Sequence, residues 1–430
     1  MPYSIILKEY EKKTLNDINK ELNTENAFCN KELLQLEKYL AKNHLSSALK
    51  TGADSITAKY WVGVVKFRNF QFEILPKLIS EESASKETIL NNLVFMLSYT
   101  RKLDIKTTDN ANLSKTSNPF LEILIREYAN SLFDCLKRLT PKNYIREENN
   151  LNYIKGKLKF TEDIRYNASN QAKFYCEYDE FSENNILNQL FYFVSNGLYT
   201  ISKDRKNKTV LKLIINYFQD IDLVNFDSNK CDKIKLSRAQ MLFEKPFKLA
   251  KMFVEHSSVD LSKNKFENIT MLWDMNKLFE EFVYRIIKNK IPEVKAEAQK
   301  CKRLLRNNKT TRRDTKVDIL ITKKSDGTKI ILDTKYKKAE SLEDIDNADI
   351  YQVMTYCLLH DESKENKNSA ILLYPQYKQN KKTSIPEYCI NSQERQYSLK
   401  MSTVNLMHEN LKDNNVLNVI TKEIKDIIGV

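Results

Sequence analysis

The chain has 430 residues, of which 41% are hydrophobic and 10% aromatic, a composition typical of a globular protein and not of a disordered one. Its 6 glycines and 8 prolines argue against collagen-like or linker-dominated architectures, and no repeat with a solenoid period is visible. A formal net charge of +13 favours a polyanionic partner, either nucleic acid or an anionic membrane surface, although a compositional bias toward lysine would give the same charge.

The N-terminal region is predicted to be rich in β-strands. It opens with a short apolar stretch that charges follow at once, without the cleavage site of a secretory signal. No stretch is long enough to span a bilayer, so we expect a cytoplasmic protein without a membrane partner. A helix is expected from Glu32 to His44. The runs Tyr60–Phe67 and Phe70–Leu75 are rich in β-branched and aromatic side chains and flank a short polar turn, which predicts a hairpin that ends at Pro76.

Helices are predicted to dominate the middle region. The polar run from Ser80 to Lys86 is the first candidate linker. Apolar residues then recur at helical spacing from Ile89 to Leu97, and Asn118 with Pro119 forms an N-cap and first-turn pair for a long helix. The pattern is mixed and polar from Tyr153 to Phe181, and helical spacing returns after it. These apolar stripes are interpreted as the core faces of ordinary helices.

The C-terminal region has the element order of a compact α/β domain with a mixed sheet. An amphipathic helix is predicted from Leu278 to Ile287. Two apolar strands, Val317–Ile321 and Lys329–Tyr336, flank an Asp-Gly turn, which is a strong hairpin signal. A helix from Ala348 to Leu359 and a strand from Ala370 to Tyr374 follow. The chain is thus expected to have an α/β (α+β) fold. A β-rich N-terminal region covers residues 1–85, a mostly helical middle region covers residues 86–265, and a C-terminal mixed-sheet domain covers residues 266–430.

The C-terminal hairpin is suited to hold a divalent cation. Asp333 and Lys335 lie two residues apart on one strand and so point to the same face, and the turn lets Asp318 of the neighbouring strand approach Asp333. Two carboxylates with water and a phosphate oxygen satisfy Mg²⁺, and Mn²⁺ is the other candidate. The set predicts phosphodiester cleavage, with Lys335 orienting a water or offsetting charge on the phosphate. A strand-end salt bridge in solvent is the structural alternative.

Other acidic residues are weaker candidates for the same site. Glu280 lies at the edge of the apolar face of the preceding helix, where it either reaches the metal or is a solvated flank residue. Asp314 is a rival to Asp318, but it precedes the apolar run of its strand. Zinc is disfavoured as the metal, because the 7 cysteines include no C-x-x-C pair and the 4 histidines form no cluster.

Basic and polar residues around the carboxylates suit a polyphosphate substrate, and the partner we expect is double-stranded DNA. Gln352 and Tyr356 share one face of the helix after the hairpin, where they contact either the DNA backbone or the surroundings of Lys335. Lysine and arginine flank the site on both sides, which suits a polyphosphate substrate, although a solvated charge run has the same pattern. The candidate DNA-binding residues are Arg303, Arg306, Lys309, Arg312, Arg313, Lys337, Lys338, Gln352 and Tyr356.

These motifs resemble those of a known family. The spacing of V-D-I-L and I-I-L-D-T-K resembles the PD-(D/E)xK nuclease motif, with Val317 in place of the usual proline, and Q-x-x-x-Y is similar to an element in some branches of that superfamily. More specifically, the chain resembles McrC, the nuclease subunit of modification-dependent McrBC restriction systems. The matching stretches span about residues 60 to 375 and include Y-W-V-G-V from Tyr60, Y-I-K-G-K-L from Tyr153, C-E-Y-D-E-F from Cys176 and L-D-T-K-Y-K from Leu332.

The resemblance implies a Mg²⁺-dependent endonuclease with a restriction-endonuclease-like sheet flanked by helices. Asp318, Asp333 and Lys335 correspond to catalytic positions, and Glu280 is carried over with them. The resemblance also implies that the N-terminal part docks into and stimulates a ring of McrB, a GTP-hydrolysing AAA+ protein. This chain has no P-loop motif, so the motor must be another polypeptide. Two other hypotheses stay open: a stand-alone nuclease of repair or defence, and an inactive regulatory adaptor on a nuclease-derived scaffold.

Overall fold

The protein is a mixed α/β chain, as the sequence predicts. Contacts divide it into two compact units, of which Met1–Lys115 with Met271–Val430 form the first and Thr116–Thr270 the second. The helices among the described residues include none with the length and apolarity of a membrane span. The computed structural model describes residues 3–24, 27–42, 45–77, 85–100, 119–170, 172–260, 265–306, 312–339, 344–361, 368–376, 388–391 and 396–430.

The N-terminal part of the first unit is built on a sheet. β1 (Tyr3–Lys8) pairs in parallel with β6 (Phe70–Leu75), and β6 pairs antiparallel with β5 (Trp61–Phe67). The hairpin predicted here is therefore present, and the helix predicted from Glu32 is α2. The smaller elements beside the sheet are β2 (Lys12–Thr14), α1 (Leu15–Glu21), α2 (Asn30–Lys42), β3 (Leu49–Thr51) and β4 (Ser55–Ala58).

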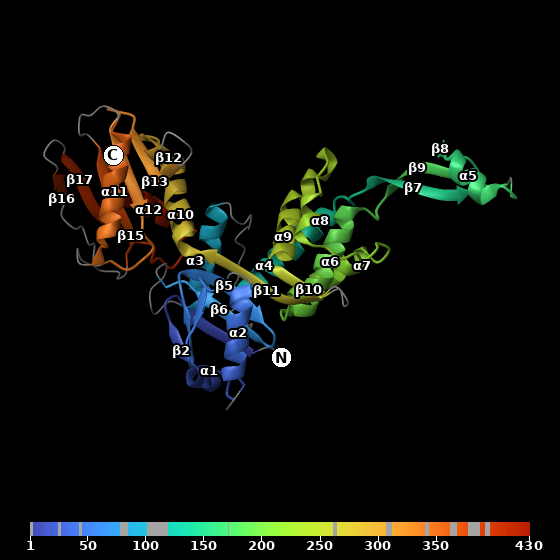
Figure 1. Ribbon diagram of the computed structural model, residues 1–430, viewed down its shortest axis with the longest axis horizontal. Helices are drawn as coiled ribbons and strands as arrows, with labels where there is room; N and C mark the ends of the chain where they lie inside the picture. The colour runs from blue at the N-terminus through green and yellow to red at the C-terminus, as the bar shows by residue number, and fades with distance from the viewer. Residues whose placement is uncertain are drawn as a thin grey trace. The chain divides into compact units, whose positions relative to one another are not determined.

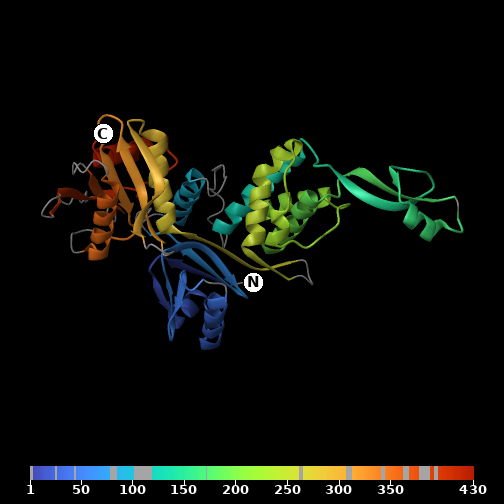
Figure 2. The ribbon, with the colours of Figure 1, turned by 45° about the horizontal axis from the view of Figure 1, so that its top comes forward.

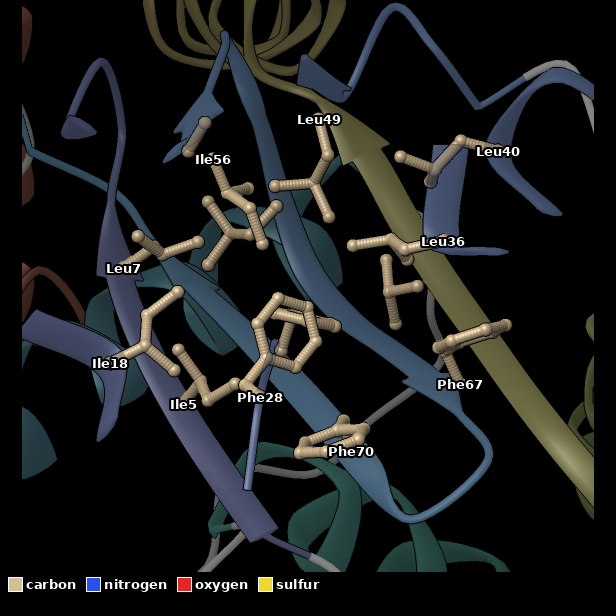
Figure 3. Packing of buried hydrophobic residues seen from close by; sticks show 14 of the residues in the cluster. Ile5, Leu7, Ile18, Phe28, Leu36, Leu40, Leu49, Ile56, Phe67 and Phe70 are labelled. Atoms are coloured by element: carbon tan, nitrogen blue, oxygen red, sulfur yellow. The ribbon is translucent and has the colours of Figure 1, made fainter. Parts of the chain in front are cut away.

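One apolar cluster holds these N-terminal elements together (Figure 3). Ile5 of β1, Leu36 of α2 and Ile56 of β4 all point into it, and each is fully buried. At its centre the ring of Phe28 meets the ring of Phe70 edge-on, with centroids 4.8 Å apart. The alternating apolar side chains of β1 and β6 therefore form one face of the hydrophobic core of these N-terminal elements.

A glycine allows β5 to lie against the strand that enters the C-terminal part. Gly63 has φ +132°, and a Cβ built on it would lie 2.0 Å from the carbonyl oxygen of Met271. No L-residue with a side chain fits at that distance. The neighbouring strand is β11 (Lys265–Asp274), which pairs with β10 (Ser257–Asp260), and the chain passes from the second unit to the first within β11.

The C-terminal part of the first unit is a six-stranded mixed sheet in the order β12-β13-β14-β15-β17-β16 (Figure 1). β12, β13 and β14 form antiparallel pairs, whereas β14 with β15 and β15 with β17 run parallel. The predicted Asp-Gly hairpin is the connection of β13 to β14. The strands are β12 (Val294–Arg306), β13 (Arg312–Lys323), β14 (Lys329–Thr334), β15 (Ser369–Pro375), β16 (Tyr388–Asn391) and β17 (Gln396–Val404).

Helices cover the two faces of this sheet (Figure 2). Leu320 and Ile331 share a buried cluster with Val353 and Cys357 of α11, on one face. On the other face, α10 contacts β12, β13 and β14, and α12 contacts β17 and α10. These helices are α10 (Met275–Lys290), α11 (Asn347–His360) and α12 (Asn414–Ile428).

Helix α3 (Lys86–Tyr99) belongs to the first unit, although the sequence analysis places it in the helical middle region. Its Phe95 and Tyr99 pack edge-on against Phe282 of α10, with ring centroids 6.4 and 5.4 Å apart. The aromatic contacts, and not sequence proximity, decide where α3 packs.

The second unit combines a helical bundle with a β-rich arm. In the arm, β7 (Asn143–Leu151) pairs antiparallel with β9 (Phe174–Ser182), β8 (Lys157–Leu158) pairs with β9, and α5 (Phe160–Asn167) contacts β9 (Figure 1). The sequence pattern of residues 143–182, mixed and polar, does not predict these strands. The bundle helices are α4 (Pro119–Leu136), α6 (Ile186–Ile201), α7 (Arg205–Tyr217), α8 (Ser228–Asp232), η1 (Arg238–Phe243) and α9 (Glu244–Glu255).

Candidate functional site

The two carboxylates singled out in the sequence lie on neighbouring strands of the C-terminal sheet. Ile319 of β13 pairs with Leu332 of β14, so Asp318 and Asp333 are the next residues along the two strands. Asp333 is 0% exposed at the end of its apolar strand. The backbone amide and the hydroxyl of Thr334 donate to Oδ2 of Asp318 at 3.0 and 3.1 Å. The hairpin therefore brings the two acids together and fixes one of them.

Lys335 supplies the cation of the site. Its Nζ lies 2.8 Å from Oδ2 of Asp333 and 3.2 Å from Oδ1 of Asp349, and it donates to Oε1 of Gln352 at 3.0 Å. Burial opposes the charged form, but the carboxylates of Asp333 and Asp349 outweigh burial and raise the pKa of Lys335. The group is therefore a fixed ammonium, which suits phosphate binding and not proton abstraction.

Asp349 of α11 is a site residue that is not among those predicted from the sequence. One of its oxygens lies 3.2 Å from Nζ of Lys335 and the other 2.9 Å from Nζ of Lys337, so a single carboxylate joins two lysines. Asp349 precedes Gln352 by three residues and thus shares its helix face. In the sequence, an acidic residue three positions before the Q-x-x-x-Y element is the pattern from which Asp349 could have been predicted.

Gln352 and Tyr356 lie in the surroundings of Lys335, one of the two positions expected for them. Nε2 of Gln352 donates to the hydroxyl of Tyr356 at 2.6 Å, while its Oε1 accepts from Lys335. Tyr356 is only 4% exposed, which leaves little of it for a contact with DNA. The pair therefore orients the lysine.

Glu280 of α10 is the third carboxylate. Nε2 of Gln299 donates to its Oε1 at 2.6 Å. Burial, and then the charge of Asp318, raise the pKa of Glu280 to about 7. Gln299 has φ +53° within β12, and the ladder skips its pairing with Asp318 although the pairs on either side are regular. A non-glycine residue in the left-handed region is strained, and strain of this kind gathers at functional sites. Nothing in the sequence pattern marks Gln299.

These acids suit a divalent cation. Burial, and then the charge of Asp318, raise the pKa of Asp333, and burial raises that of Asp318, so the anions are crowded. Oδ1 of Asp333 is buried and accepts no hydrogen bond from the described residues, as a ligand oxygen would. No group of three or more His, Cys, Asp or Glu side chains in the described part of the chain could hold a metal by itself. The residues therefore fit an open Mg²⁺ site, which takes one or two carboxylates and is completed by water and substrate phosphate.

The predicted basic residues before Asp318 belong to the long hairpin of β12 and β13. Arg303 is exposed and pairs in register with Asp314, four residues before Asp318, which places the rival acid on the outer part of the hairpin. Lys309 lies outside the described residues. The backbones of three further candidates lie in the two strands, but their side chains are outside the description: Arg306, Arg312 and Arg313.

The predicted basic residues after Asp333 differ in their surroundings. Nζ of Lys337 lies 2.5 Å from Oδ2 of Asp346 and 2.9 Å from Oδ2 of Asp349, so this lysine is held beside the site. Lys338 is exposed. Lys337 and Lys338 thus lie at the end of the strand that carries Asp333.

Comparisons with known proteins identify the family. A search of curated proteins finds no match. A chain of the half-complex from a tetradecameric assembly of Thermococcus gammatolerans McrB AAA+ hexamers with bound McrC is 19% identical, with a TM-score of 0.76 over 99% of this chain and 100% of that one. A chain of the cryo-EM structure of the T. gammatolerans McrBC complex is 23% identical, with a TM-score of 0.54 over 66% and 87%. These likenesses show the fold. The family model described as "McrBC 5-methylcytosine restriction system component" matches residues 56–375, and the chain therefore belongs to that family.

Proposed function

We propose that this chain is a Mg²⁺-dependent endonuclease that cleaves DNA phosphodiester bonds at a PD-(D/E)xK-type site formed by Asp318, Asp333 and Lys335. The observation that carries the proposal is Asp333, a fully buried carboxylate beside a lysine, with an Oδ1 that accepts no hydrogen bond from the described residues. Lys335 compensates Oδ2 only, and a buried carboxylate oxygen with no partner destabilises the fold unless it binds a cation. Its position therefore supports a chemical role.

The chain's own residues have distinct parts in the proposed reaction. Asp318 and Asp333 would hold Mg²⁺, with Mn²⁺ as the alternative. When bound, the cation supplies a Lewis acid for the scissile phosphate and makes a water more acidic. Lys335 offsets charge that develops on the phosphate oxygens, and Asp349 keeps its ammonium in place. Glu280, held by Gln299, is a third carboxyl group that interacts with the pair and titrates near neutral pH, with a pKa of about 7.

The substrate is double-stranded DNA. Lysine and arginine occur along the β12–β13 hairpin, whose strand β13 carries Asp318, and Lys337 pairs with Asp349, the acid that also contacts Lys335. Neutralised phosphates supply most of the sequence-independent affinity of a DNA-binding protein. The net charge of +13 supports the same conclusion.

The reaction belongs to modification-dependent restriction of foreign DNA, with an McrB-like AAA+ GTPase ring as partner. Membership of the family supports the first statement. The T. gammatolerans assembly, which contains McrB AAA+ hexamers with bound McrC, supports the second. The N-terminal region, residues 1–85, is the part that we assign to docking and stimulation of the ring.

Two acids four residues apart in β13 give a matched test. With Mg²⁺, DNA, the partner GTPase and GTP, Asp318→Asn should lower the cleavage rate by about 10²–10³-fold, as loss of a transition-state contact does. Lys335→Met should have a similar effect. Asp314→Asn, a change of the same chemistry in the same strand, should leave the rate within about twofold of the wild type, because surface substitutions have small effects. Loss of cleavage in Asp314→Asn with retention in Asp318→Asn would contradict the assignment.

A further inference from the structure

Glu9 is a buried acid that the proposed reaction does not use. It follows β1 and is 0% exposed. Its Oε2 accepts from the backbone amide of Lys77 at 2.9 Å and from the hydroxyl of Tyr336 at 3.0 Å. Its own amide donates to the carbonyl of Leu75 at 3.0 Å. Glu9 is thus anchored in the N-terminal sheet and reaches a residue 327 positions away.

Tyr336 connects this acid to the residues next to Lys335 and to the helix that carries Glu280. It follows Lys335 in the chain and is 1% exposed. The amide of Lys335 donates to the carbonyl of Leu373 at 2.9 Å, so the sheet continues up to this point. The ring of Tyr336 packs against the ring of Phe279, the residue before Glu280, with centroids 5.9 Å apart. The ring of Tyr336 therefore contacts the helix that carries Glu280, while its backbone directly follows Lys335.

The chemistry of this contact argues for a positional role. An apolar pair of the same size would fill the space without the desolvation of a carboxyl group and a hydroxyl group. A hydrogen bond, unlike an apolar contact, fixes the direction and distance of its partners. Burial, more than any other cause, raises the pKa of Glu9 to about 8, so near neutral pH the group is mainly an uncharged acid. The contact is therefore a neutral hydrogen bond that needs no counter-ion.

We propose that Glu9 and Tyr336 are positioning residues through which the N-terminal sheet sets the geometry of Lys335 and Glu280. The proposal rests on the nuclease function proposed above. It gives the N-terminal region a physical route to the active site through the hydrogen bond between Glu9 and Tyr336. A network of this kind is established only by measured coupling between its members.

The test uses the full chain with four substitutions. Tyr336→Phe removes only the hydroxyl, and Glu9→Met removes the acceptor while keeping a flexible side chain of similar length. Glu9→Gln keeps a carbonyl acceptor and mimics the uncharged acid. Tyr128→Phe is the matched control, because Tyr128 is also fully buried and its hydroxyl is bonded, to Phe191 and Ser195 of the second unit.

Two readouts are measured for each variant. The first is hydrogen exchange of the peptide Lys329–Lys338, and the second is kcat against KM for cleavage of methylated DNA at saturating Mg²⁺ with the partner GTPase and GTP. We expect Tyr336→Phe and Glu9→Met to exchange faster and to lose about tenfold in kcat with little change in KM, as small misplacements of catalytic groups do. Glu9→Gln should restore both values to near those of the wild type. The double variant of Tyr336→Phe and Glu9→Met should be no slower than the slower single variant.

Other outcomes would contradict the positioning role of the hydrogen bond between Glu9 and Tyr336. Unchanged exchange and unchanged kcat in a folded Tyr336→Phe would overturn it, as would additive losses in the double variant. A response to Tyr128→Phe equal to that of Tyr336→Phe would also overturn it, because general destabilisation would then explain the data. If the wild type cleaves no DNA, the proposed nuclease function fails. Faster exchange in both single variants, with no further rise in the double variant, would still support the positional link in that case.

Discussion

Among single residues, Asp333 is the most deeply buried acid of the site, and its Oδ1 accepts no hydrogen bond from the described residues. Its carboxylate is fully buried, and the nearby charge of Asp318 disfavours its ionised form. The ammonium of Lys335 offsets part of the unfavourable energy of the buried Asp333 carboxylate, but it also interacts with Asp349. The metal-free arrangement is therefore under electrostatic stress that a bound divalent cation would remove.

Replacing Asp333 should separate stability from activity. Asp333→Asn removes the repulsion with Asp318, so the metal-free thermal midpoint should stay unchanged or rise, while cleavage is abolished. The wild type should gain thermal stability when Mg²⁺ is added and lose it with EDTA, because a ligand that binds only the folded state stabilises it. The variant should show little of this gain. Thermal unfolding with and without Mg²⁺ measures both effects, and Asp326→Asn in the exposed β13–β14 turn is the control. An unfolded Asp333→Asn would mean that the acid is structural.

Glu9 should make the stability of the protein depend on pH. Its pKa is about 8 in the folded chain against an ordinary value of 4.5, so between these values the folded state holds a proton that the unfolded state has lost. Stability should therefore fall as the pH rises from about 5 to about 8, by an amount on the order of a few kcal/mol.

The variant Glu9→Gln should lose this dependence. At pH 5 its free energy of unfolding should be close to that of the wild type, and at pH 8 the variant should be the more stable of the two. Urea unfolding at the two pH values measures the difference. Parallel curves for the two proteins would show that the carboxyl group ionises as easily in the folded chain as in the unfolded one.

At the scale of secondary-structure elements, the sequence predicts those elements that have a strong local pattern and fails for those that have a weak one. The hairpin of β13 and β14 was predicted from Asp326 and Gly327 between apolar runs, and it brings Asp318 and Asp333 together. Strand β7 was missed because most of its side chains are exposed and few are apolar, and strand β9 was missed because charged residues interrupt its apolar ones. The parts played by Asp349 and Gln299 depend on how α11 and α10 pack against the sheet, which no local pattern encodes. The catalytic assignment of the cluster stays a prediction.

Two glycines with positive φ should differ in their tolerance of a methyl group. Gly63→Ala places Cβ 2.0 Å from the carbonyl of Met271, so strain and overpacking together should cost about 3 kcal/mol or more. Gly327→Ala meets no atom within 4 Å and should cost only about 1–2 kcal/mol, the penalty of the left-handed backbone. Chemical unfolding of both variants gives the comparison. Equal losses would mean that β5 can move away from β11.

The β12–β13 hairpin should contribute to DNA affinity through charge. Arg303→Ala should weaken binding of DNA and reduce the salt slope of the affinity by about one, the value for one lost phosphate contact, without changing kcat. Lys295→Ala is the matched control, since Lys295 is exposed in the same strand but pairs with Thr322 at its opposite end. Fluorescence anisotropy over a range of salt concentrations measures both. An equal loss in the control would assign the effect to net charge alone.

In the whole molecule, the first unit is assembled from the two ends of the chain. Asn92 of α3 donates to the carbonyl of His408 at 2.8 Å and accepts from the amide of Leu411 at 3.0 Å, and Glu9 accepts from Tyr336. Contacts that span more than three hundred residues leave no trace in the periodicity of a single sequence. This explains why the sequence predicted a three-part chain, whereas contacts divide the chain into two units.

The most direct test of the nuclease assignment is cleavage of methylated and unmethylated plasmid DNA with Mg²⁺, in the presence and absence of the partner GTPase and GTP. The wild type should cut the methylated plasmid only in the complete mixture, whereas Asp333→Asn should not cut it and should still stimulate GTP hydrolysis. Absence of cleavage in every mixture, or equal cleavage by Asp333→Asn, would contradict the assignment of the active site.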